Sequence, residues 1–316
     1  MGRMLADIAE HLACPVCGQS LRLDPGALRC PRGHSFDVAR QGYVSLLVGS
    51  RPPGTADSAE MVAARDAFLS AGHFAPLESA LAEAVWSAHA ESFSHSPDDG
   101  RAKAYGGSGH GAEPVIVDAG AGTGHYSAAV LDAAGRGVVM AFDVSKHAVR
   151  RAARAHPRVG AFVADVWRRL PIGDGVADVV MNVFAPRNGP EFRRILRPGG
   201  RVVVVTPAPG HLSPLVKELG LLSVDAGKEQ RVARSLEGFA EVERRVVAFD
   251  MALGPDEVRA VVGMGPSAWH LGEEELAEGI TRVFSRNNAK RLEKVVTKAE
   301  FHLSTFEVTP GARSPS

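Results

Sequence analysis

The three cysteines of this chain lie near its N-terminus, and a histidine follows the last of them. Cys14 and Cys17 form one pair, and Cys30 and His34 form a second pair after twelve intervening residues. Two such pairs can direct three thiolates and one imidazole at one tetrahedral Zn²⁺ ion. Because this set leaves no position for water, the spacing predicts one structural zinc site. Ordinary buried cysteines beside an unrelated histidine are the alternative.

A second group of residues suited to chemistry occupies positions 115–126. There the chain reads Val-Ile-Val-Asp-Ala-Gly-Ala-Gly-Thr-Gly-His-Tyr. A β-branched run that leads into alternating glycines predicts a strand, a tight turn and the start of a helix. Glycine adopts positive φ and lets a ligand approach the backbone, while the free N–H groups of a helix start carry partial positive charge. The stretch therefore predicts a site for a nucleotide-like cofactor.

Carboxylates around this turn narrow the choice of cofactor. The spacing Asp-x-Gly-x-Gly-x-Gly from Asp118 resembles motif I of class I S-adenosylmethionine methyltransferases, whereas dinucleotide sites carry Gly-x-Gly-x-x-Gly. Asp143 ends the next apolar run and suits a ribose diol. Asp165 ends a third run, at the place where this class holds adenine. The resemblance implies S-adenosyl-L-methionine as cofactor, with contacts at Asp118, Gly120, Gly122, Gly124, Asp143 and Asp165. A structural turn without a ligand is the alternative.

The elements that position these residues follow from periodicity. Residues 113–316 alternate strand-like and helical segments, which is typical of an α/β fold with a parallel sheet. We expect the Rossmann-like seven-stranded sheet of the class I methyltransferases. Ligands of such sheets bind beyond the carboxyl ends of the strands, so residues 182–188 should border the reacting methyl group. Residues 285–298 are predicted to form a basic amphipathic helix, either with a solvated face or in contact with phosphate.

The N-terminal part is organised differently. Residues 21–29 are predicted to form a hairpin that brings the two ligand pairs together. The capping-box spacing of residues 57–60 predicts a helix that Gly72 ends, and Pro76 begins another helix. The buried side of the first helix should consist of Met61, Val62, Phe68 and Leu69. We therefore divide the chain into a zinc-binding module (1–50), a helical linker with a flexible Gly/Ser-rich loop (51–112) and a methyltransferase domain (113–316).

Composition limits the function classes. Basic and acidic residues both number 36, so the net charge does not point to nucleic acid, although it can hide a local basic patch. No apolar run reaches the ~20 residues that span a bilayer, and the first ten residues are too polar for a signal peptide. Three clustered cysteines do not form the disulfide framework of a secreted protein. We expect a cytoplasmic globular protein without a membrane partner.

Taken together, the motifs resemble one family, the zinc-containing 23S rRNA guanine-N1 methyltransferases, and in particular the type that confers resistance to tylosin- and mycinamicin-class macrolides. The strings that carry the resemblance are Cys-Pro-Val-Cys at 14–17, Cys-Pro-Arg-Gly-His-Ser-Phe-Asp at 30–37, Gly-Tyr-Val-Ser-Leu-Leu at 42–47, Asp-Ser-Ala-Glu-Met at 57–61, Ala-Gly-His-Phe-Ala-Pro-Leu at 71–77, the glycine turn, Asp-Val-Ser-Lys at 143–146, Ala-Pro at 185–186, Thr-Pro at 206–207 and His-Leu at 211–212. Residues 150–157 and 183–190 favour the macrolide-resistance branch.

The resemblance implies several roles. Cys14, Cys17, Cys30 and His34 would hold zinc, and the zinc module would help to bind a hairpin loop of 23S rRNA. Cofactor contacts are implied at Phe74, Gly124, His125 and His211. Relatives often carry tyrosine at the position of Phe74, so only stacking or packing would remain here. A homodimer is compatible with this reading.

The implied reaction transfers the sulfonium methyl group to N1 of a guanine. That nitrogen carries a proton in the neutral base, so the site must remove it, and the Watson–Crick edge must be unpaired. Asn182 and Asn188 are placed by topology to bind a purine edge, and no catalytic base is assigned. The alternatives are a small-molecule methyltransferase of natural-product metabolism and a noncatalytic RNA-binding protein of the same fold.

Overall fold

The computed structural model describes residues 3–49, 56–94, 113–221, 228–265, 272–285 and 293–309. Most of the Gly/Ser-rich loop expected at 94–111 lies outside these residues. In the part of the chain that is described, no helix combines the length and the apolar character needed to cross a membrane.

A mixed sheet of eight strands forms the centre of the molecule, in the order β10-β11-β9-β8-β5-β6-β7-β4. Its strands are β4 (Val44–Ser45), β5 (Val115–Ala119), β6 (Val138–Asp143), β7 (Val159–Val163), β8 (Ala177–Val183), β9 (Leu196–Pro207), β10 (Phe239–Leu253) and β11 (Val295–Val308). The pairs from β4 to β9 are parallel, and β11 and β10 are antiparallel. Seven strands give the expected class I arrangement, and β4 from the N-terminal region adds an eighth.

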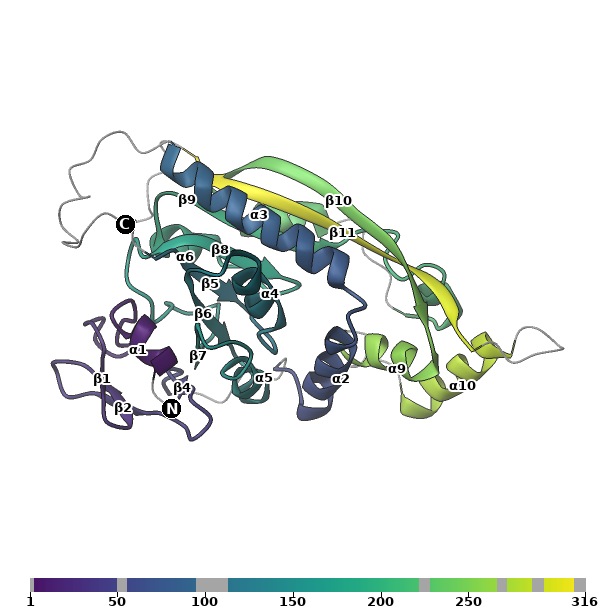
Figure 1. Cartoon of the computed structure of the whole chain (residues 1–316), viewed down its shortest axis with the longest axis horizontal. Coiled ribbons are helices and arrows are strands. Elements are labelled where there is room, and N and C mark those ends of the chain that lie inside the picture. Colours follow the sequence, from purple (N-terminus) through teal and green to yellow (C-terminus); the bar gives the residue numbers. More distant parts are fainter. Residues whose placement is uncertain are drawn as a thin grey trace.

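The parallel strands are short and apolar because both of their faces are covered. Every residue of β5, β7 and β8 is buried, as expected for strands with helices on both sides. Figure 1 shows α3 (Ala75–Ser94) running alongside the long strands β10 and β11. The remaining helices are α1 (Arg3–Ala9), α2 (Ala59–Ser70), α4 (His125–Ala134), α5 (Lys146–Ala152), α6 (Gly189–Ile195), α7 (Leu215–Glu218), α8 (Lys228–Ser235), α9 (Pro255–Gly263) and α10 (Glu273–Phe284).

Helix α2 shows how local signals set an element that later borders the site. Its four buried residues are the four expected from periodicity, and Gly72 follows its C-cap with a φ of 77°. Its N-cap is Ser58, whose Oγ accepts a hydrogen bond from the Met61 amide at 3.2 Å. A side-chain cap of this kind stabilises a helix by about 1 kcal/mol.

The N-terminal region forms a small sheet of its own. Its strands β1 (Arg22–Asp24), β2 (Ala27–Arg29) and β3 (Ser35–Asp37) are antiparallel, and β1 and β2 are the expected hairpin. The region joins the central sheet through Val44 of β4, which pairs in parallel with Phe162 of β7. It therefore lies at the β7 edge of the large sheet (Figure 1).

The basic helix expected at 285–298 is wrong where the structure describes it. Ser285 is the C-cap of α10, and residues 295–298 begin β11, in which Val295 pairs with Leu253. From Val296 to Ala299 exposed and buried residues alternate, which is the period of a strand. The β-branched residues at this position favour pairing with β10 over a helix. Residues 286–292 lie outside the described part.

Candidate functional site

The four predicted metal ligands converge on one point. Their ligand atoms all lie within 4.8 Å of one another. The Cys30 sulfur lies 3.3 Å from His34 Nδ1, and the Cys17 and Cys30 sulfurs are 3.7 Å apart. Zn–S bonds of ~2.3 Å in a tetrahedron place sulfurs roughly 3.8 Å from each other, so this spacing fits zinc. The β1–β2 hairpin brings the pairs together, and Cys14, Cys17, Cys30 and His34 are arranged to bind a metal.

The surroundings of Cys30 favour the thiolate that zinc requires. Loss of water contact alone would raise its pKa, but the backbone amides of His34 and Arg32 and the His34 side chain outweigh this effect. The pKa of Cys30 is lowered to about 6. Nearby N–H groups stabilise the negative charge on sulfur, as in other low-pKa cysteines.

The predicted cofactor residues follow three neighbouring parallel strands. Asp118 is the penultimate residue of β5, Asp143 ends β6, and Asp165 follows β7 by two residues. The register pairs Asp118 with Ala141 and Asp143 with Val163, so the three carboxylates lie at the carboxyl ends of these strands. We call this end of the sheet the cofactor edge. This is the edge at which open α/β sheets bind ligands.

The turn after β5 requires glycine for two different reasons. Gly120, Gly122 and Gly124 have φ angles of 81°, 54° and 77°, which side-chain-bearing residues rarely adopt. A Cβ on Gly120 would overlap Ala185, and one on Gly124 would lie 2.8 Å from the Ala152 backbone. A Cβ on Gly122 would meet only the Arg65 side chain, at 3.4 Å. Gly122 is therefore the glycine that faces the side chains of the site.

Asp118 is a buried carboxyl group with a perturbed pKa. Burial raises its pKa to about 7, against a smaller opposing effect of the Ser127 hydroxyl, which donates to it at 2.5 Å. The neighbouring Asp143 raises it further. A carboxyl group in this setting is partly protonated near neutral pH.

Asp143 connects the turn to the next strand. Its carboxylate accepts hydrogen bonds from the Gly122 amide at 3.0 Å and from the Ser145 amide at 2.8 Å. Burial raises its pKa, and the two amides oppose that shift. Asp165 accepts a hydrogen bond from the Trp167 amide at 3.0 Å and pairs with Arg168. Ribose and adenine contacts at these two residues stay predictions.

Helices α2 and α3 add groups that the sequence did not single out. Glu78 of α3 lies 2.8 Å from Nε2 of His125, the first residue of α4. Arg65 of α2 pairs with Asp57 and donates to the Met264 carbonyl. The Tyr126 hydroxyl is buried without a hydrogen-bond partner among the described residues. An orphaned buried hydroxyl is costly unless a ligand or water satisfies it.

Phe74 and His211 come together in an aromatic cluster next to this edge. The ring of Phe301 lies 5.1 Å from Phe74 and 4.7 Å from His211. The Phe74 side chain is only 1% exposed, so it packs as a core residue and direct cofactor contact would need a change of packing. His211 is partly exposed, and its Nδ1 accepts a hydrogen bond from the Glu300 amide at 3.3 Å. Cofactor contact at either residue stays a prediction.

Phe184 lies in the loop after β8, within residues 182–188, which were expected to border the methyl group, but the sequence did not single it out. It has a φ of 55°, which is uncommon for a residue with a bulky side chain and indicates a constrained backbone. Its ring is 42% exposed and lies 6.3 Å from Tyr126 and 5.3 Å from Phe301. Phe184 thus lies between the glycine turn and the aromatic cluster. Its position in the loop expected to border the methyl group is the signal that could have drawn attention to it.

The two asparagines of this loop have other partners than the expected purine. Asn182 is fully buried and donates to the carbonyls of Ala119 and Pro186, both at 2.9 Å. Its Oδ1 accepts from Arg187. Asn188 caps α6 and donates to the Val166 carbonyl at 2.8 Å. Both side chains therefore shape the loop after β8.

The donor set fits S-adenosylmethionine. Carboxylates line the edge where a ribose would lie, Gly122 keeps the turn open, and the Tyr126 hydroxyl lacks a partner among the described residues. A zinc-ribbon family model described as RlmA, N-terminal, matches residues 12–49, and a methyltransferase-domain model matches residues 116–200. Fold and site define a class I S-adenosylmethionine-dependent methyltransferase with an N-terminal zinc ribbon.

Relatives specify the family further. The chain is 54% identical over 272 residues to a Micromonospora griseorubida protein named "Putative 23S rRNA (guanine-N(1)-)-methyltransferase", which covers 84% of this chain and 90% of the relative. It is 46% identical over 282 residues to the 23S rRNA (guanine(748)-N(1))-methyltransferase of Streptomyces fradiae, with 89% and 93% coverage. The chain belongs to the 23S rRNA (guanine-N1)-methyltransferase family.

Removal of zinc should unfold the ribbon before it disturbs the cofactor edge. A structural zinc ion contributes about 10–16 kcal/mol of apparent binding energy to the element it organises. We expect chelation, or the variant His34→Ala, to abolish amide protection in β1–β3 while β5 and β6 stay protected. Hydrogen exchange with metal analysis measures this. Protection of β1–β3 that is unchanged by complete metal removal would contradict a structural role.

Replacing Asp118 should remove a pH-dependent loss of stability. Its folded pKa is raised, so its contribution is fully present below the unfolded pKa near 3.8 and is lost as pH rises through about 7. We compare the free energy of unfolding of Asp118→Asn with that of the wild type. We expect this difference to favour the variant by about 1–3 kcal/mol more at pH 8 than at pH 5. Urea unfolding of the ligand-free protein measures the difference. The exposed Asp7→Asn variant is the control, and equal pH profiles for wild type and Asp118→Asn would contradict the assignment.

Proposed function

We propose that this protein transfers the methyl group of S-adenosyl-L-methionine to N1 of a guanine in a hairpin loop of 23S rRNA. The observation that carries the proposal is the similarity to guanine-N1 methyltransferases over most of both chains, which includes both the zinc ribbon and the cofactor domain. The fold alone would allow many substrates, because function depends on the site rather than on the fold.

The cofactor supplies an activated methyl group on its sulfonium sulfur when it is bound. On the protein side, Asp143 and Asp165 are proposed to hold the nucleoside part, and His125 and His211 to border it. Asp118 and the three glycines of the turn shape the floor of the site. Positioning of the two reactants and exclusion of water would provide much of the rate enhancement.

Phe184 is proposed to stack on the target guanine. An unpaired loop base can be splayed out and stacked on an aromatic side chain, which exposes N1 to the cofactor. The partly exposed ring of Phe184 projects from the loop after β8, where such a base would meet the methyl group. The constrained backbone of this residue supports a fixed orientation of the ring.

The zinc ribbon is proposed to bind the stem or loop of the hairpin beside this edge. It joins the central sheet next to β7, the strand that precedes Asp165, so an RNA held by the ribbon could reach the cofactor edge. Macrolide resistance is the proposed consequence, because residues 150–157 and 183–190 resemble the macrolide-resistance branch of the family. A homodimer is part of the same proposal.

Labelling of RNA tests the proposal directly. Purified protein is incubated with methyl-labelled S-adenosylmethionine and naked 23S rRNA, assembled large subunits or macrolide precursors, and the label is located by primer extension. We expect one strong extension stop at a loop guanine, because a methyl group on N1 blocks pairing. Label on the macrolide alone would favour a small-molecule methyltransferase, and RNA binding without label would favour a noncatalytic protein.

Removal of the Phe184 ring should slow methylation without weakening cofactor binding. Base stacking contributes about 1–3 kcal/mol, so we expect Phe184→Gly to lose roughly 5- to 150-fold in kcat/KM for RNA. Glycine accommodates the positive φ, and Phe184→Tyr should keep most activity as the matched control. Steady-state kinetics and calorimetry with S-adenosylmethionine measure the two effects. A Phe184→Gly enzyme with wild-type kcat/KM would contradict the stacking role.

A further inference from the structure

A shallow pocket of about 360 Å³ lies beside the proposed cofactor edge and has no role in the functions described so far. Its walls come from Trp167 after β7, from Arg187 and Asn188 after β8, and from Arg231, Arg234 and Ser235 of α8. We name it the Trp167 pocket. Three arginines line it, and none of the described residues in its wall is acidic.

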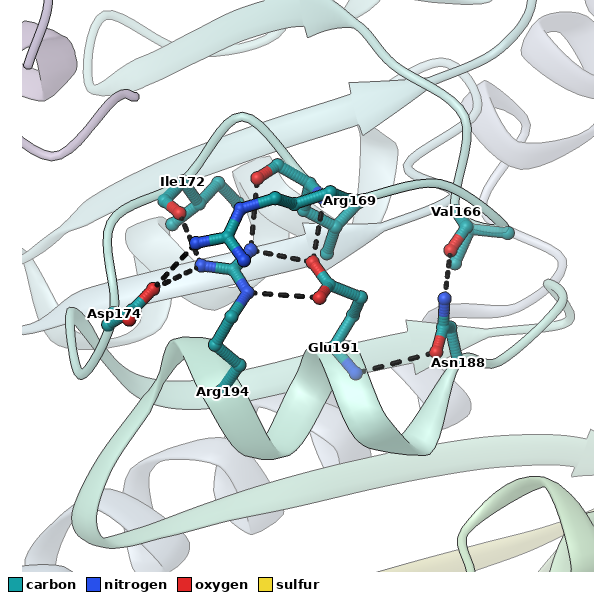
Figure 2. A network of polar contacts seen from close by, with 8 residues as sticks. Val166, Arg169, Ile172, Asp174, Asn188, Glu191 and Arg194 are labelled. Carbon is teal, nitrogen blue, oxygen red and sulfur yellow. Dashed lines mark hydrogen bonds and ion pairs between the residues drawn. The ribbon is translucent and has the colours of Figure 1, made fainter. Parts of the chain in front are cut away.

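Trp167 presents an aromatic face to solvent on a rigid support. Its side chain is 64% exposed, which is unusual for a residue of this size. The loop that carries it is held against α6 by a polar network (Figure 2). In this network Asn188 donates to the Val166 carbonyl, and Glu191 accepts from the Leu170 amide at 2.7 Å.

Arg194 completes the support by binding the same loop at several points. Its guanidinium donates to the carbonyls of Leu170 and Ile172 and pairs with Asp174 and Glu191 (Figure 2). The contacts with Asp174 and Glu191 are ion pairs, and the Glu191 side chain is largely buried. Such charge-assisted hydrogen bonds hold the loop in a well-defined conformation. An aromatic side chain on such a loop is pre-organised for stacking.

Arg187 forms the cationic floor of the pocket. Its guanidinium donates to Ser235 Oγ at 3.2 Å, to Asn182 Oδ1 at 3.2 Å and to the Ala185 carbonyl at 3.3 Å. These partners are neutral, and burial lowers the pKa of Arg187 without an opposing carboxylate. Among the described residues its hydrogen-bond partners are all neutral, and a half-buried cation in such a setting is stabilised when an anion binds next to it.

Arg231 and Arg234 add positive charge on the opposite wall. They are three residues apart in α8, so both lie on one face of that helix, and both are exposed. A cluster of arginines beside one exposed aromatic ring has the composition of a single-stranded nucleic-acid site, in which cations hold the backbone and bases stack on the ring.

The position of the pocket connects the two known parts of the molecule. Trp167 lies two residues beyond Asp165, and Arg187 lies three residues beyond Phe184. In the other direction, residues 169–171 of the same loop line a second pocket, of about 420 Å³, together with residues 13–18 of the first zinc-ligand pair. An RNA strand that runs from the zinc ribbon to the cofactor edge would therefore pass this loop.

We propose that the Trp167 pocket binds one nucleotide of the RNA strand that flanks the target guanine, with its base stacked on Trp167 and its phosphate held by Arg187, Arg231 and Arg234. The proposal rests on the proposed function, since it assigns a second contact for the same RNA. Such a contact fixes the register of the strand and so helps to select the guanine that reaches Phe184.

Substitutions at the two ends of the pocket test this proposal. We expect Trp167→Ala and Arg234→Glu each to raise the Kd and KM for a 23S rRNA transcript about tenfold, within the range for loss of one stacked base or one phosphate contact. The salt dependence of log K should become shallower by about one unit for Arg234→Ala. The kcat at saturating RNA and the affinity for S-adenosylmethionine should stay within twofold of wild type.

Two further variants separate stacking and local charge from general effects. Trp167→Phe should keep RNA affinity but lose its share of the tryptophan fluorescence quench that RNA causes. Arg136→Glu is the matched charge control, because Arg136 is exposed and lies just before β6, at the amino ends of the parallel strands and away from the cofactor edge. We expect its RNA affinity to stay near that of the wild type.

The outcomes distinguish this proposal from the proposed function. If Trp167→Ala and Arg234→Glu bind RNA as tightly as Arg136→Glu while the wild type methylates guanine N1, the pocket assignment is wrong and the function stands. If Trp167→Ala weakens S-adenosylmethionine instead of RNA, the pocket belongs to the cofactor. If the wild type binds the transcript through Trp167 but places no methyl group on it, the proposed function fails and the pocket assignment stands.

Discussion

The close packing of the turn after β5 is the constraint on which the site depends. Gly120 leaves no room for a side chain beside Ala185, and Gly124 leaves none beside the backbone of Ala152. The turn is therefore held between the loop after β8 and helix α5. This contact sets the position of the Gly122 amide, which in turn donates to Asp143. Strand ends that are far apart in sequence thus become one surface.

Electrostatics at this surface are finely balanced because the carboxylates are buried close together. Burial raises the pKa of both Asp118 and Asp143, and the charge of Asp143 raises that of Asp118 further. The Ser127 hydroxyl opposes the shift of Asp118, and the Gly122 and Ser145 amides oppose that of Asp143. Arg65 lies next to Gly122 and lowers the pKa of Asp143. Buried ionisable groups whose pKa values are shifted by burial and by neighbouring charges are typical of functional sites. The cost in stability is accepted where the chemistry requires it.

The zinc ribbon is integrated with the catalytic sheet rather than tethered to it. Pairing of β4 with β7, and an isolated bridge between Leu12 and Ile172, connect the ribbon to the segments on either side of Trp167. The same loop is bound to α6 by Glu191 and Arg194 (Figure 2). The metal site and the proposed RNA contacts near the cofactor edge are therefore linked through a few shared backbone segments.

Local chemistry in the sequence was sufficient for the metal ligands, the glycine turn, the positions along the chain of the parallel strands from β5 to β9, and the covered side of α2. Each of these depends on short-range signals: the spacing of Cys14 and Cys17, the alternation of glycines after Asp118, or β-branched runs of five to seven residues. The substrate class came from the family resemblance, because a pattern of apolar and polar residues does not indicate a substrate. The helix expected at 285–298 was wrong over residues 295–298, where pairing with β10 outweighed a weak helical pattern.

Only the tertiary structure decided which side chains are exposed to a ligand and which are engaged in contacts within the protein. Asn182 and Asn188 looked suited to a purine, but long-range contacts engage both, whereas Phe184 is exposed on a constrained backbone. Phe74 is buried among rings from four other segments, and Trp167 is held outward by a network that spans two loops and a helix. Burial and hydrogen bonding depend on residues distant in sequence, so the spacing of residues along the chain could not reveal them.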